Sequence, residues 1–195
     1  SANINLELSE IRKGLVPSKR WKLNVKGTRW TPGETINASI GQGYMLSNPI
    51  ELTTMTARIA NSEMSVEPTL LKNKRKKFLK LDINKGHLNY IKNAMSNVVN
   101  NELGTAFKSR LNSKSIKMAG KTGTVQVVRI SEEEREKGII KNKDREWKKR
   151  DHALFVGYAP FEKPKYSICV IVEHGGSGSV TAAPIAKDVI EKLLI

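Results

Sequence analysis

One stretch near the middle of the chain constrains the fold more than any other. Its ten residues read AGKTGTVQVV and occupy positions 119–128. Its three valines are good strand formers, so the stretch predicts a β-strand. Two glycines interrupt it, at positions 120 and 123, and a glycine inside a strand often marks the close approach of another backbone.

The same stretch carries a set of side chains suited to an acidic ligand. Alternate residues of a strand share a face, so Thr122 and Thr124 point the same way, with Lys121 and Gly123 between them. The hydroxyls and the ammonium group can hold a carboxylate while the strand edge pairs with an extended peptide. A bare Lys-Thr-Gly triplet also recurs by accident, so an ordinary strand is the alternative.

Composition limits the remaining possibilities. The chain has 195 residues, 38% of them hydrophobic, which is enough for one globular domain over residues 1–195. A single cysteine, Cys169, excludes an internal disulfide, and we expect it to be a small buried side chain. His87, His152 and His174 are far apart in the sequence, so we expect no metal and no cofactor. No apolar run approaches twenty residues, so we expect this chain itself to make no membrane contact.

The net charge of +15 favours anionic partners. Basic residues gather at positions 72–80 and 141–150, each with a single aromatic residue nearby. A nucleic-acid surface usually adds stacking aromatics or groove-reading elements to such charge. We therefore interpret both clusters as solvated connections and do not favour nucleic-acid binding, which stays as an alternative function.

Four segments together resemble the class B penicillin-binding proteins. They follow one another in the family's order and read IGQGYMLSNPIEL at 40–52, IKMAGKTGTVQV at 116–127, HALFVGYAP at 152–160 and VEHGGSGS at 172–179. Lys-Thr-Gly is the third signature of the penicillin-recognising serine acyl-enzymes. The Gly-Gln-Gly-Tyr form is similar to penicillin-binding protein 2, the elongation-specific peptidoglycan D,D-transpeptidase. A related β-lactam-recognising hydrolase or sensor is the second alternative.

The resemblance implies serine acyl transfer on the D-Ala-D-Ala end of a peptidoglycan stem peptide, with β-lactams as inhibitors. It implies that Lys121 is catalytic, supplying positive charge, and that Thr122, Gly123 and Thr124 bind substrate. The family's nucleophile lies in a Ser-x-x-Lys motif, and no serine here is followed three residues later by lysine. The one Ser-x-Asn match, at Ser1, is interpreted as a decoy. We therefore expect the C-terminal portion of a transpeptidase domain, inactive alone, from a parent anchored at the periplasmic face of the bacterial inner membrane.

The expected fold class is α+β. Three main strands, at 118–128, 153–159 and 166–173, form an antiparallel sheet flanked by helices, as a partial penicillin-binding-protein and β-lactamase-like transpeptidase fold. Apolar spacing predicts three helices whose buried stripes are Leu52, Met55 and Ile59; Leu88, Ile91, Met95, Val98 and Val99; and Ile185, Val189 and Leu193.

Two further expectations concern the edges of this fold. The resemblance implies that early strands of the parent domain lie beside the strand at 166–173, whose apolar run at 168–172 predicts burial on both faces. Without those strands, we expect this edge to pair with a second copy of the chain or to be shielded by residues near Ser1. The long polar connection at 129–151 borders the binding strand, and we expect it to be a mobile flap.

Overall fold

The computed structural model describes residues 12–71, 78–128 and 130–194. Its centre is a three-stranded antiparallel sheet in the order β1-β2-β3, formed by β1 (Ala119–Val125), β2 (His152–Ala159) and β3 (Tyr166–Val172). The predicted sheet is confirmed, although β1 ends three residues early. Val125 pairs with His152, the first residue of β2, so β2 offers no partner to the valines beyond position 125.

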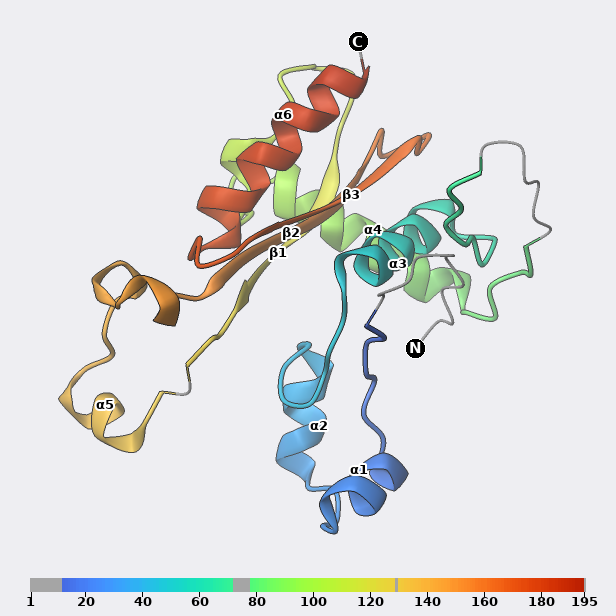
Figure 1. Ribbon diagram of the computed structural model, residues 1–195. Coiled ribbons are helices and arrows are strands. Elements are labelled where there is room, and N and C mark those ends of the chain that lie inside the picture. Colours follow the sequence, from blue (N-terminus) through green and yellow to red (C-terminus); the bar gives the residue numbers. More distant parts are fainter. Residues whose placement is uncertain (1–11, 72–77, 129, 195) are drawn as a thin grey trace.

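Helices cover both faces of this sheet (Figure 1). The long helices and the short helical turns, in chain order, are α1 (Lys19–Lys26), α2 (Pro32–Ser39), α3 (Pro49–Asn61), α4 (Lys85–Asn100), η1 (Phe107–Ser109), α5 (Glu132–Lys137), η2 (Asn142–Asp144), η3 (Trp147–Lys149), η4 (Gly178–Ala182) and α6 (Ala183–Leu194). None of the helices in the described ranges combines the length and the apolar character needed to cross a membrane.

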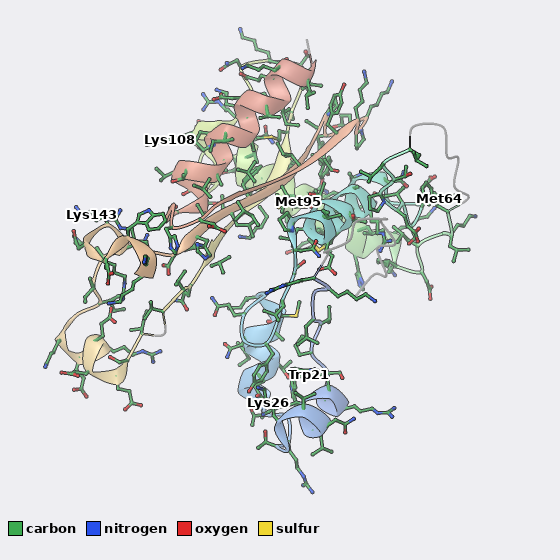
Figure 2. The ribbon with its side chains drawn as sticks, viewed as in Figure 1. Trp21, Lys26, Met64, Met95, Lys108 and Lys143 are labelled. Carbon is green, nitrogen blue, oxygen red and sulfur yellow. The ribbon has the colours of Figure 1, made fainter. Side chains whose placement is uncertain are left out.

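The central strand β2 supplies the core on both sides. Phe155 points to the face covered by α6, where it is fully buried with Met118 and Ile190. Tyr158 points to the opposite face, where it packs with Ala60 of α3 and Met95 of α4. Figure 2 labels Met95. Burial on both faces is therefore a property of β2. The prediction that β3 is buried on both faces is wrong: among the described residues β3 is an edge strand, and Ile171 is 41% exposed.

The buried faces of two helices also differ from the prediction. In α6 the residues with no exposure are Ala183, Ala186 and Ile190, whereas the predicted stripe of Ile185, Val189 and Leu193 is 40–48% exposed. In α3 the buried residues are Thr54, Thr56 and Ala60, and the predicted Met55 is 47% exposed. The α4 prediction holds for Leu88, Met95 and Val99, while Ile91 is 40% exposed.

Small side chains explain the difference. Alanine lets a helix backbone approach the sheet closely, so the larger aliphatic residues turn outward. The buried threonines of α3 satisfy their hydroxyls locally, because Thr54 Oγ1 donates to the carbonyl of Ile50 and Thr56 Oγ1 donates to the carbonyl of Leu52. A polar side chain whose hydrogen bond is met inside its own helix can replace an aliphatic one in the core.

Helices α1 and α2 form a lobe that extends away from the sheet (Figure 1). Its centre is Lys22, only 6% exposed, whose Nζ donates to Glu34 and to the carbonyl of Arg29. The hydrogen bond from Lys22, followed by one from the Thr31 backbone, lowers the pKa of the Glu34 carboxyl. Trp21 and Lys26 of α1, labelled in Figure 2, pack on Tyr44 of the Gly-Gln-Gly-Tyr segment.

Candidate functional site

The four candidate residues, 121–124, lie in the part of β1 that follows its two buried residues. Ala119 is buried, Lys121 and Thr124 are exposed, and Thr122 and Gly123 are partly buried. Within the described ranges β1 is an edge strand, paired only with β2. Lys121 and its threonine neighbours are therefore accessible to a ligand that lies along the strand, which is what the sequence interpretation requires.

The strand register separates these residues as alternation predicts. Thr122 pairs with Phe155, and Lys121 pairs with the next residue of β2, Val156. The two threonines share the face of Phe155, and Lys121 leaves from the opposite face. The Lys121 ammonium donates to the backbone carbonyl of Thr122. The cation therefore lies beside the backbone of Thr122, although the Lys121 side chain begins on the face opposite the threonine hydroxyls.

The close backbone approach predicted at the strand glycines is present. A Cβ atom on Gly178, the first residue of η4, would lie 2.4 Å from the carbonyl oxygen of Gly123 and 2.2 Å from that of Leu154. A Cβ on Gly120 would lie 2.2 Å from the ring of Phe155. The start of the C-terminal helical region therefore packs directly on the backbone of the candidate strand.

One neighbour of the site was missed from the sequence. Thr105, in the turn after α4, places its Oγ1 3.0 Å from Oγ1 of Thr122. Strand periodicity says nothing about this residue, because it lies 17 positions upstream in a turn. Only the expectation that α4 directly precedes the strand could have suggested that this turn returns to it.

The structure joins two histidines that are distant in sequence. His152 begins β2 and His174 follows β3, so antiparallel pairing brings their ring centroids to 4.7 Å. The backbone N–H of His174 donates to Nδ1 of His152 at 2.8 Å, and the indole of Trp147 lies against His174 with the ring centroids 4.4 Å apart. Among the described residues, no group of three or more His, Cys, Asp or Glu side chains could hold a metal ion.

The connection from β1 to β2 extends beyond the end of the sheet (Figure 1). Ser131 caps α5 by accepting from the backbone of Glu134, and the Glu134 side chain forms an ion pair with Arg145. Arg150 donates to the carbonyls of Lys143 and Arg145. The arginines of the 141–150 cluster are thus used inside the connection, whereas its lysines are exposed. Most of the 72–80 cluster lies outside the described residues, as does Ser1.

Comparison with known proteins gives a consistent result. The family described as "Penicillin binding protein transpeptidase domain" matches residues 2–191. Peptidoglycan D,D-transpeptidase MrdA of Acinetobacter baumannii is 33% identical over 201 residues, and that of Haemophilus influenzae is 32% identical over 200. Each alignment covers 97% of this chain but only 29% and 30% of the relative.

Solved structures agree with this assignment. The penicillin-binding protein PBP2 in complex with MreC from Helicobacter pylori has a TM-score of 0.81 and 32% identity over 98% of this chain and 33% of its own. Pseudomonas aeruginosa PBP2, solved in complex with WCK 5153, has a TM-score of 0.75 and 35% identity over 93% of this chain and 38% of its own. Neither the nucleic-acid alternative nor the hydrolase or sensor alternative is favoured by these matches. By its fold, its segment order and its family match, the chain belongs to the penicillin-binding protein transpeptidase domain family.

Proposed function

We propose that this chain provides the substrate-binding strand of a peptidoglycan D,D-transpeptidase. The observation that carries the proposal is the position of Lys121-Thr122-Gly123-Thr124, with Lys121 and Thr124 exposed, on a strand that forms a sheet edge within the described residues. The terminal D-Ala-D-Ala of a stem peptide lies along β1, with its carboxylate held by the hydroxyls of Thr122 and Thr124. A β-lactam occupies the same position.

The roles within the strand follow from the chemistry of acyl transfer. Lys121 supplies positive charge next to the reacting groups and orients the proton relay. The backbone N–H of Thr124 serves as one donor to the oxyanion that forms when the carbonyl is attacked. The attacking serine belongs to a Ser-x-x-Lys motif outside these 195 residues, in a membrane-anchored protein at the periplasmic face of the inner membrane. Residues 1–195 then constitute the C-terminal portion of the transpeptidase domain and are inactive alone.

The test compares two lysine substitutions in the full-length protein. We expect Lys121→Met to lower the rate of acylation by a fluorescent penicillin about a hundredfold or more, because a charge beside the reacting groups is lost. Lys117→Met is the matched control, since Lys117 is exposed and lies just before β1. Equal rates for both variants contradict the role of Lys121. The isolated 195-residue chain gives no adduct that survives denaturation, and a labelled band from it contradicts the proposed position of the serine.

The edge of β3 is a second candidate binding surface, for a strand of another copy of the chain. Within the described residues β3 pairs only with β2, and an unpaired apolar edge favours the addition of another strand. In the isolated chain this edge pairs with a second copy, forming a homodimer; in the full-length protein other strands cover it. Sedimentation of the isolated chain, compared with a variant carrying Ile171→Lys, tests this. A monomer at all concentrations argues against self-association.

A further inference from the structure

The contact between Thr105 and Thr122 joins the turn after α4 to the candidate strand. Their hydroxyl oxygens are 3.0 Å apart, within hydrogen-bonding distance. Thr122 is one of the two hydroxyls assigned above to the substrate carboxylate. Thr105 is exposed, and its side-chain contact with the candidate strand is the Thr122 hydroxyl.

The backbone on both sides of Thr105 is fixed to α4. The Gly104 N–H donates to the carbonyl of Asn101 at 2.8 Å, and the Ala106 N–H donates to the carbonyl of Val98 at 2.9 Å. Ala106 is 1% exposed. A Cβ on Gly104 would lie 2.4 Å from the carbonyl oxygens of Asn97 and Val98, so only glycine fits where the turn meets the helix. Thr105 is therefore held by neighbours that cannot shift freely.

A second link fixes α4 to the strand. Asn100, the last residue of α4, donates from Nδ2 to the carbonyl of Met118 at 2.8 Å, one residue before β1 begins. Met118 is itself fully buried. Thr105 and Thr122 consequently extend from two parts of one tightly packed unit. The core therefore fixes the backbone positions from which the two hydroxyls meet at the surface.

The geometry points to Thr105 as a positioning residue that directs the Thr122 hydroxyl toward the substrate carboxylate. This inference rests on the proposed function of Thr122. A carboxylate only accepts hydrogen bonds, so Thr122 must donate to it and can then accept from Thr105. The two hydroxyls form a directed chain in which each bond polarises the next. Without the Thr105 hydroxyl, Thr122 loses the donor that orients its own hydroxyl toward the carboxylate.

The experiment measures acylation of the full-length protein by a β-lactam with a free carboxylate. We expect Thr105→Val, which keeps the side-chain shape, to lower the second-order rate constant about fivefold. Thr105→Ser restores the hydroxyl and is expected to recover most of the wild-type rate. In a Thr122→Val background, Thr105→Val is expected to cause no further loss, because the residue acts only through Thr122.

Each outcome bears on one of the two proposals. If Thr105→Ser is as slow as Thr105→Val, or if the loss persists in the Thr122→Val background, the positioning role is wrong and the effect is structural. Thermal melting of each variant identifies a folding defect directly. If Thr122→Val reduces acylation while Thr105→Val does not, only this inference fails. If neither Thr122→Val nor Lys121→Met changes acylation, the proposed function fails with it.

Discussion

Cys169 shows how the sheet controls the chemistry of a single side chain. It lies on β3 and is partly buried, where burial raises the pKa of its thiol to about 11 and a hydrogen bond with Thr53 of α3 lowers it only in part. An unperturbed thiol has a pKa of about 8.5. The folded chain therefore holds the thiol proton more tightly than the unfolded chain, and this contribution to stability is complete below about pH 8.5 and is lost as the pH rises through about 11.

The corresponding prediction concerns alkylation. At pH 8 the thiolate fraction of folded Cys169 is lower than that of a free thiol by about two hundredfold, so iodoacetamide should modify the native chain about two hundred times more slowly than the chain in denaturant. The measurement is the labelling rate by mass spectrometry, with a cysteine-containing peptide as the reference thiol. Equal rates for the native and denatured chains rule out the protected site.

At the scale of secondary structure, the connection between β1 and β2 depends on an internal ion pair. Glu134 and Arg145 have side chains only 14% and 13% exposed, and Glu134 also accepts from the backbone of Ile140. Removing one partner of a largely buried pair leaves the other charge uncompensated. We expect Arg145→Met to speed limited proteolysis within residues 131–151, while thermal melting of the sheet changes little.

Lys143→Met provides the matched control, since Lys143 is exposed in the same connection and Figure 2 labels it beside the short helical turns that precede β2. It removes the same charge without breaking the pair, and its cleavage rate should match the wild type. If both variants are cut equally fast, net charge and not the Glu134 contact governs the connection. Whether the connection is a mobile flap, as the sequence predicts, stays a prediction that the same cleavage rates address.

Helices also show where sequence reasoning succeeds and where it fails. Caps depend on local chemistry, so the start of α3 at Asn48 and that of α5 at Ser131 could be predicted from a few adjacent residues. Buried faces depend on the partner surface, and in α6 the sheet selects alanines at 183 and 186 where the largest side chains suggested otherwise. The site strand could be predicted because its motif is contiguous, whereas Thr105 could not, because its role depends on tertiary packing.

For the molecule as a whole, stability should depend on the face of α6 that meets the sheet. Ile190 is fully buried in the cluster with Phe155, whereas Ile185 is 43% exposed on the same helix. Ile190→Ala should lower the free energy of unfolding by about 3 kcal/mol, because it removes packed volume from the core. Ile185→Ala, the same chemical change, should cost less than about 1 kcal/mol.

Urea unfolding of the two variants, followed by circular dichroism, gives both values from the shift in midpoint. The order of the two costs is the decisive result. A larger loss for Ile185→Ala would mean that the sequence-predicted stripe, and not the alanine face, is the one that packs in solution.

The contact of Gly178 with the backbone of Gly123 has a consequence for the geometry of the candidate strand. No side chain fits between the first turn of η4 and β1, because a single methyl group would meet two carbonyl oxygens. Even alanine at position 178 must displace the strand on which the proposed ligand lies. A substitution 55 positions beyond the motif therefore alters the shape of the motif strand through backbone contact alone.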